Sequence, residues 1–293
     1  SFNENSKLWQ DKEKELASKP NIKKVFSKEK KIVSEFNQDL KLDISFDKTN
    51  NKVFNNRNNF GFQNFEGELN KTGNFKFSKF KDFSQIDFFP IILKDGVIFF
   101  DRKGSIGKFN KDQKIIWKRN YYSDLEKKLL PKLDFILNKE NLIVTDNISK
   151  YYSFNLNSGE LNWSKNNAYP FNSDIKKYGN KFYVIDYKNT LRCFSVIDGS
   201  ECWNLQTEDT FTVSSSKYSL ILLNDIIVFN NSVGDITAVD IKTGLITWLL
   251  PTQGRDIVSE AFNFKFSKLV SDNNSIFFSN NKSEFYSIDV KTG

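Results

Sequence analysis

The stretch Ala238-Val239-Asp240-Ile241-Lys242-Thr243-Gly244-Leu245-Ile246-Thr247-Trp248 decides the fold, because weaker copies of it recur through most of the chain. Each copy has a β-rich run, a short polar break, a second β-rich run, a Gly and an aromatic residue four positions later. The clearest copies pair Gly159 with Trp163, Gly199 with Trp203, and Gly244 with Trp248.

Three further copies are incomplete. One leads from Gly73 to Phe77, one keeps Trp117 but has lost its Gly, and the last stops at Gly293 before its aromatic residue. Successive aromatic positions lie 40 to 46 residues apart, within the roughly 40–50 residues of one propeller blade. The sequence therefore predicts an all-β fold, a β-propeller of four-stranded antiparallel blades that is incomplete in this chain.

Composition and residue pattern indicate the domain organisation. The chain has 293 residues, of which 39% are hydrophobic and 27% are charged, values typical of a globular protein. Residues 1–37 are rich in charged helix formers and are predicted to be an arm or tether. Residues 38–293 are predicted to form about six blade units, the last one truncated, with the alternating run at 40–46 as a strand that closes the ring.

Two broad partner classes are disfavoured. The net charge is +7, but Lys is scattered singly among Asp, Glu and Asn, whereas a nucleic-acid site gathers its basic residues on one face. We therefore expect no nucleic-acid partner. No apolar run approaches the ~18–20 residues that a membrane-spanning helix needs.

Gly and Trp of the repeat have structural roles in this interpretation. Gly159, Gly199 and Gly244 end a hairpin loop at a position that favours a left-handed backbone. A large apolar indole four residues later is suited to fill the wedge between neighbouring sheets. These structural blade-docking indoles are Trp117, Trp163, Trp203 and Trp248.

Catalytic and metal-binding residues are scarce in the sequence. The chain contains no His, the commonest general base near neutral pH and the commonest zinc ligand in proteins. Its two cysteines, Cys193 and Cys202, fall in one predicted hairpin, where they face each other if the loop closes as it does around Asp240. A disulfide and a pair of buried free thiols both fit this placement.

The repeat resembles the pyrroloquinoline-quinone-type propeller motif Ala-x-Asp-x-x-Thr-Gly-x-x-x-Trp, which residues 238–248 match at every defined position. Within that superfamily the chain looks most like the BamB family of outer-membrane protein assembly factors. The basic arm, the long loop of residues 251–260 and the final blade ending at Gly293 carry this resemblance.

The resemblance implies a non-enzymatic periplasmic scaffold, associated with the outer membrane of a Gram-negative bacterium. Its partners would be a BamA-like barrel-assembly subunit and unfolded outer-membrane protein clients, and it would reach the membrane only through a lipid anchor upstream of this chain. The family's BamA-contacting turn corresponds by motif position to Ile288, Val290 and Lys291. Exposed loop residues are additional candidate contacts: Tyr121, Tyr122 and Arg255.

Two alternatives use the same fold. A quinone-dependent dehydrogenase resembles this chain in its repeat, but such enzymes add adjacent cysteines and calcium ligands, and neither pattern is present. A ligand-sensing propeller is the other alternative, because a fold alone does not assign a function. We therefore expect no catalytic residue, no metal and no cofactor.

Overall fold

The computed structural model describes residues 52–63, 68, 70, 71, 73, 90–208, 216–252, 266–281 and 283–293. The chain divides into two units, Ser1–Asp47 and Lys48–Gly293, and all of the described residues belong to the second. The predicted arm, the predicted strand at 40–46 and the aromatic position Phe77 lie outside the described residues.

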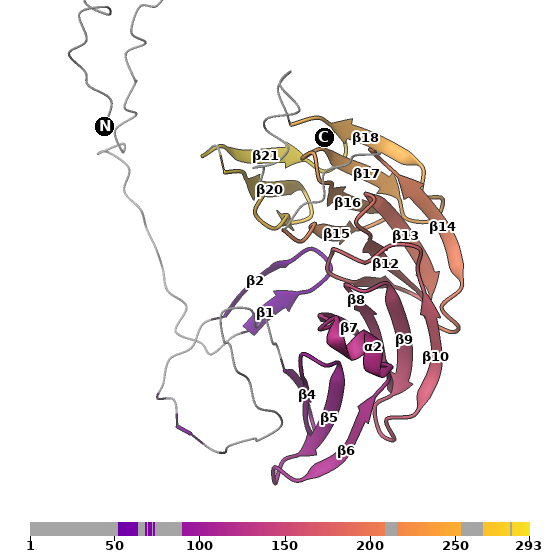
Figure 1. Ribbon diagram of the computed structural model, residues 1–293. Helices are drawn as coiled ribbons and strands as arrows, with labels where there is room; N and C mark the ends of the chain where they lie inside the picture. Colours follow the sequence, from indigo (N-terminus) through magenta and orange to yellow (C-terminus); the bar gives the residue numbers. More distant parts are fainter. Residues whose placement is uncertain are drawn as a thin grey trace, which may run out of the picture. The chain divides into compact units, whose positions relative to one another are not determined.

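The longest described part of the chain forms antiparallel sheets whose strands are hydrogen-bonded in chain order (Figure 1). We call these sheets blades 1 to 5. Blade 1 comprises β3 (Ile91–Leu93), β4 (Gly96–Phe100), β5 (Ser105–Asn110) and β6 (Ile115–Asn120). Blade 2 comprises β7 (Leu133–Asn138), β8 (Asn141–Asp146), β9 (Lys150–Asn155) and β10 (Leu161–Asn166).

The later blades continue the series. Blade 3 comprises β11 (Lys176–Tyr178), β12 (Lys181–Ile185), β13 (Thr190–Ser195) and β14 (Glu201–Gln206). Blade 4 comprises β15 (Leu220–Leu223), β16 (Ile226–Asn230), β17 (Ile236–Asp240) and β18 (Ile246–Leu250). Blade 5 has three described strands, β19 (Val270–Ser271), β20 (Ser275–Ser279) and β21 (Phe285–Asp289).

Two short elements lie outside the blades. A hairpin of β1 (Lys52–Asn55) and β2 (Phe60–Gln63) forms a two-stranded sheet of its own. The short helix α2 (Asp124–Lys128) connects blade 1 to blade 2 and begins with a capping box between Ser123 and Glu126. Neither element was expected from the repeat.

The core lies between the blades. Each of four clusters of buried side chains draws its members from two successive blades. Ile143 of β8, for example, packs with Phe182 of blade 3, whereas its chain neighbour Val144 packs with Ile98 of blade 1. Side chains alternate between the two faces of a strand, so a blade between two others buries both faces. This explains runs such as Leu220–Leu223, in which every residue is buried.

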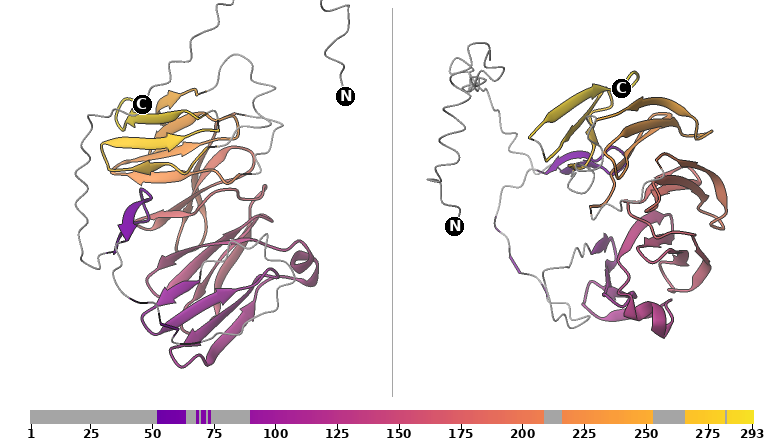
Figure 2. Two further views of the ribbon diagram at one scale, coloured as in Figure 1. Left: turned by 90° about the vertical axis from the view of Figure 1, so that its left-hand side faces the viewer. Right: turned by 45° about the horizontal axis from the view of Figure 1, so that its top comes forward.

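Successive blades lie side by side in chain order in two views, as the blades of a propeller do (Figures 1 and 2). The predicted fold class, an all-β propeller of four-stranded antiparallel blades, is confirmed. The repeat pattern predicts strands at 105–110, 150–155, 190–195 and 226–230, and the structure places β5, β9, β13 and β16 at these residues.

The first strand of blade 3 is the clearest difference. The sequence predicts a strand at 171–176, whereas β11 begins at Lys176. Two competing hydrogen bonds explain the shift. The carbonyl of Asn172 accepts from the Tyr218 amide at 2.7 Å, and the Ser173 hydroxyl accepts from the Ile185 amide at 2.8 Å. This segment therefore bonds partly to the next blade instead of only to its own.

Candidate functional site

The repeated outer turn, which joins the third and fourth strands of a blade, is built around a polar side chain and a Gly. In blade 4 the Asp240 carboxylate accepts from the amides of Lys242 at 2.9 Å and Thr243 at 2.8 Å, and the Gly244 amide donates to the Asp240 carbonyl at 2.9 Å. These hydrogen bonds hold the pKa of Asp240 below its usual value. Gly244 has a φ of +74°, and Gly159 and Gly199 have φ values of +66° and +69°, a region that Gly enters without steric cost.

The indole of the preceding blade packs against each of these turn glycines. A Cβ placed on Gly159 would lie 2.8 Å from Trp117, and one on Gly199 would lie 2.7 Å from Trp163. A Cβ on Gly244 would lie 2.7 Å from Trp203, and one on Gly293 would lie 2.9 Å from Trp248. The four indoles thus lie at the junctions between blades, each against the outer turn of the next one.

Polar contacts reinforce these junctions. The Trp117 Nε1–H donates to the Leu156 carbonyl at 3.1 Å, and the Trp248 Nε1–H donates to the Val290 carbonyl at 3.0 Å. The Tyr121 hydroxyl donates to the Gly159 carbonyl at 2.6 Å. A buried aromatic group that also finds a hydrogen-bond partner contributes both apolar burial and orientation.

The expectation that Tyr121 and Tyr122 are exposed loop contacts is wrong. Tyr122 is 4% exposed and its hydroxyl donates to the Asp146 carboxylate at 2.6 Å, while Tyr121 packs on Phe154 with ring centroids 5.5 Å apart. The polar flanks of these residues suggested a surface loop. In the structure the segment leading to α2 crosses the blade 1–blade 2 junction, where it covers the core.

The predicted partner turn is only partly accessible. Val290 is 7% exposed and belongs to the core between blades 4 and 5, and Ile288 is half-buried against the same cluster. Lys291 is exposed, and its amide donates to the Asp289 carboxylate at 2.8 Å. Of the three side chains, Lys291 alone is fully available to a partner. Arg255 lies outside the described residues.

The cysteine register differs from the expected one. Cys193 pairs with Trp203, and Phe194 pairs with Glu201, so Cys202 is the extra residue of a β-bulge. The one-to-one pairing of Cys193 with Cys202 is therefore wrong. Both residues carry free thiols in the structure, with Cys193 buried and Cys202 exposed.

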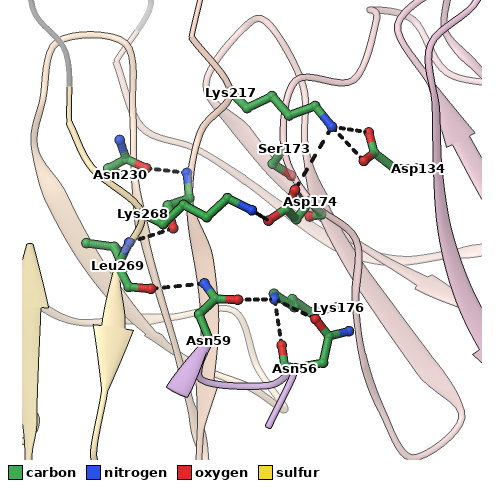
Figure 3. Close-up of polar contacts among 11 residues, drawn as sticks. Asn56, Asn59, Asp134, Ser173, Asp174, Lys176, Lys217, Asn230, Lys268 and Leu269 are labelled. Carbon is green, nitrogen blue, oxygen red and sulfur yellow. Dashed lines mark hydrogen bonds and ion pairs between the residues drawn. The ribbon is translucent and has the colours of Figure 1, made fainter. Parts of the chain in front are cut away.

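The inner strands carry a polar cluster that the repeat did not predict (Figure 3). Lys176 of β11 is 2% exposed, and its ammonium donates to the Asn56 carbonyl at 2.5 Å and to the Asn59 side-chain oxygen at 2.6 Å. Burial lowers the pKa of Lys176 to about 8. The turn between β1 and β2 is thus fastened to blade 3 by a residue more than one hundred positions away.

The same turn reaches two more blades. The Arg57 carbonyl accepts from the Leu222 amide of β15 at 2.7 Å, and the Asn58 carbonyl accepts from the Ser271 amide of β19 at 3.1 Å. The Asn59 side-chain amide donates to the Leu269 carbonyl at 2.9 Å. We call residues 55–59 the inner clasp, because they bond to blades 3, 4 and 5.

Charged groups lie beside the inner clasp. Lys217 pairs with Asp134 at 2.6 Å, and Lys268 pairs with Asp174 at 3.0 Å (Figure 3). Burial raises the pKa of Asp134 despite the attraction of Lys217. Burial acts in the same direction on Asp174, but the attraction of Lys268 and Lys217 outweighs it and lowers its pKa. These pairs join segments of blades 2, 3, 4 and 5.

One shallow hollow lies over blade 3, with a volume of about 260 Å³. Its lining is polar and comprises Tyr169, Lys188, Thr190, Arg192, Asn204 and Gln206. The Arg192 guanidinium is engaged by the Asp186 and Glu201 carboxylates at 2.7 and 2.8 Å. Within the described residues, no group of three or more His, Cys, Asp or Glu side chains is placed to hold a metal ion. In the same part of the chain, no helix has the length and apolarity to cross a membrane.

Comparison with a solved BamB structure supports the propeller fold. The crystal structure of BamB from Moraxella catarrhalis matches with a TM-score of 0.55 and 16% identity, covering 68% of this chain and 60% of that protein. The chain therefore spans 60% of the length of that BamB. The computationally designed Ika4 protein matches with a TM-score of 0.44 and 12% identity, covering 54% of this chain and 91% of Ika4. A search of curated proteins gave no match.

The family described as outer membrane protein assembly factor BamB matches residues 102–293, which is more than half of the chain. The match spans the outer turns and the Gly–Trp junctions of blades 1 to 5. This chain therefore belongs to the BamB family of PQQ-type repeat propellers.

Proposed function

We propose that the protein is a non-enzymatic periplasmic scaffold that assists the assembly of outer-membrane β-barrel proteins. The family match over residues 102–293 carries this proposal. In it, the protein binds a BamA-like barrel-assembly subunit and is held at the outer membrane of a Gram-negative bacterium by a lipid attached upstream of this chain. Its blades supply a rigid surface, and no bond is made or broken.

The last outer turn is the proposed contact with the barrel-assembly subunit. Its exposed cation, Lys291, follows a carboxylate whose pKa is lowered by hydrogen bonds from the Lys291 and Thr292 amides. The turn is thereby held in one conformation before a partner binds, which reduces the entropy lost on binding. Ile288 and Val290 support the turn from the core.

The outermost strands offer a second surface, for unfolded clients. Among the described strands, β6, β10, β14 and β18 each end their sheet. Several apolar side chains on three of these strands are about half exposed: Ile115, Ile116, Leu161, Ile246 and Leu249. An extended polypeptide adds to such an edge by main-chain hydrogen bonds, while apolar side chains contact its alternate residues.

A binding experiment tests the first contact. The full chain is titrated with the periplasmic part of the barrel-assembly subunit from the same organism, and the Kd is measured for the wild type, Lys291→Glu and Lys242→Glu. Lys242 is the matched control, because it occupies the same exposed position in the blade 4 turn. We expect Lys291→Glu to weaken binding at least about tenfold, roughly 1.4 kcal/mol, with Lys242→Glu near the wild type.

Absence of any binding by the wild type contradicts the scaffold proposal. Equal weakening by both variants contradicts the specific role of Lys291, because it indicates general attraction to a basic surface. The enzyme alternative is tested separately, by adding pyrroloquinoline quinone and calcium and following a redox dye with alcohol and sugar substrates. Turnover above that of the free quinone would replace the scaffold proposal with a dehydrogenase.

A further inference from the structure

A bulge recurs at one position in blades 1 to 4. In each, the pairing of the third and fourth strands shifts by one residue immediately before the Trp. The extra residues are Ile116, Asn162, Cys202 and Thr247. Because a bulge sets two residues of one strand against a single residue of its partner, each extra residue shares with its Trp one partner on the third strand.

Blade 2 shows what this geometry does to the side chains. Ser153 is the residue paired with Trp163, and Asn162 is the extra residue of the bulge. The Asn162 side-chain amide donates to the Ser153 hydroxyl at 3.1 Å. The side chains at these two positions therefore meet on one face of the sheet. In blade 3 the same two positions hold Cys202 and Cys193.

We propose that Cys193 and Cys202 are a modification site at which an intramolecular disulfide joins β13 to β14. A disulfide needs Cβ atoms about 3.5–4.5 Å apart, and at the equivalent positions of blade 2 the Asn162 and Ser153 side chains already lie within hydrogen-bond distance, at 3.1 Å. The extra residue of the bulge supplies the local freedom for the two cysteines to reach this separation. The proposal stands on the hairpin geometry; the periplasmic location proposed above would supply the oxidising compartment.

The two cysteines have different roles in the oxidation. The exposed Cys202 thiolate attacks a disulfide-bearing oxidant, forming a mixed disulfide and releasing one thiol of the oxidant. The Cys193 thiolate then attacks the Cys202 sulfur and releases the second thiol. In sum, the two thiols lose two protons and two electrons, and the oxidant disulfide is reduced to a dithiol.

Burial makes the second step the slow one and protects its product. Cys193 is fully buried between blades 3 and 4, and burial together with the neighbouring Cys202 thiol raises its pKa. A thiol with a raised pKa is rarely a thiolate at neutral pH, so it attacks slowly. Once the bond has formed, a reductant reaches only the Cys202 side. The bond would fix the outer strand next to Trp203, which lies against Gly244 of blade 4.

The experiment uses the full purified chain, incubated with oxidised or reduced glutathione, denatured in the presence of an alkylating agent and analysed by intact mass. We expect the oxidised protein to lose two hydrogens and take up no alkylating group, and peptide mapping to show Cys193 linked to Cys202. The urea midpoint should be higher under oxidising than under reducing conditions. Cys202→Ser, a change at an exposed position, should remove this difference.

A matched control moves the pair to blade 2. Ser153→Cys with Asn162→Cys, on a Cys193→Ser and Cys202→Ser background, should form the equivalent bond, because those side chains already touch. Alkylation of both native cysteines after oxidation overturns the proposal, and so does an intermolecular dimer through Cys202 as the main product. Neither outcome affects the binding test of the scaffold proposal, which does not depend on the thiols.

Discussion

At the scale of single residues, the Gly of the outer turn meets two requirements at once. Its positive φ closes the loop, and its missing side chain admits the Trp of the preceding blade. The need for a positive φ can be predicted from the sequence, because Gly199 follows the turn-forming Asp198 and Gly244 follows Thr243. The need for space beside the Gly cannot be predicted in this way, because the Trp that packs against Gly199 belongs to another repeat.

Gly199→Ala separates these two requirements when it is compared with Gly179→Ala. Both residues have positive φ, but a Cβ on Gly179 meets open space, whereas one on Gly199 lies 2.7 Å from Trp163. The backbone cost of about 1–2 kcal/mol applies to both, and overpacking adds about 1–3 kcal/mol at Gly199 only. Urea unfolding of both variants measures the difference, and equal losses would show that the Trp contact carries no cost.

Asp146 is a second residue with an environment that the sequence does not reveal. It is 1% exposed, and its carboxylate accepts from the Ile148 and Lys150 amides and from the Tyr122 hydroxyl. Burial nevertheless raises the pKa of Asp146 to about 6. Folding therefore favours the protonated carboxyl, and the folded state loses stability as pH rises from about 4 to 6.

Asp146→Asn should remove this pH-dependent loss. The amide oxygen still accepts from the backbone, but the side chain no longer ionises. Between pH 4 and pH 7 the variant should therefore gain stability relative to the wild type, by up to about 3 kcal/mol for a shift of about two pKa units. Chemical denaturation at several pH values tests this, and a difference that is constant with pH would contradict the raised pKa.

At the scale of elements, the inner clasp is the main addition to the repeat. Residues 55–59 join three blades through main-chain carbonyls and Asn side chains. Carbonyl acceptors are present at every residue, so they leave no pattern in a sequence. Lys176 also gives no signal there, because 43 Lys and Arg residues are spread along the chain.

Lys176→Met should release the inner clasp. It removes the ammonium that donates to Asn56 and Asn59, and a hydrogen bond from a charged donor contributes about 1.5–3 kcal/mol. We expect faster hydrogen exchange at the Leu222 and Ser271 amides, which donate to the clasp.

Lys177→Met is the matched control for this prediction. Lys177 is the next residue of β11 and is only half-buried, and its side chain points to the opposite face of the strand from that of Lys176. Exchange at Leu222 and Ser271 should stay as in the wild type. If both variants accelerate exchange equally, Lys176 does not hold the clasp specifically.

At the scale of the whole described unit, the blades are coupled in series through their shared cores. Trp163 belongs to β10 but stacks on Phe182 of blade 3, with ring centroids 6.4 Å apart, and lies against Gly199. A strand of an interior blade contributes side chains to the core on each side. A substitution at one junction should therefore destabilise both adjoining blades. This distribution resembles the nearest-neighbour energetics of repeat proteins.

Trp163→Ala should therefore weaken blades 2 and 3 together. Large-to-small changes of a buried aromatic residue cost about 3–5 kcal/mol, reduced here because Trp163 is only half-buried. We expect faster hydrogen exchange in β8–β10 and in β12–β14, with blade 5 less affected. Acceleration confined to blade 2 would show that the indole does not couple the blades.

The sequence by itself determined the repeat, the blade length, the outer turns and the positions of the four indoles. These depend on residues close together in the chain, where Gly, Asp and alternating apolar residues act through local backbone geometry. The same patterns made the limits of β5, β9, β13 and β16 predictable. They did not predict where β11 begins, because the backbone before it forms a hydrogen bond to blade 4.

Only the tertiary structure decided which groups meet across the blades. The inner clasp, the burial of Tyr122 and Val290, the indole against each Gly and the bulge that places Cys202 beside Cys193 all depend on strands that are brought together by folding. Contacts of this kind depend on register and on burial on both faces of a sheet. A one-residue shift at a bulge changes them without any change in the repeat that produced the fold.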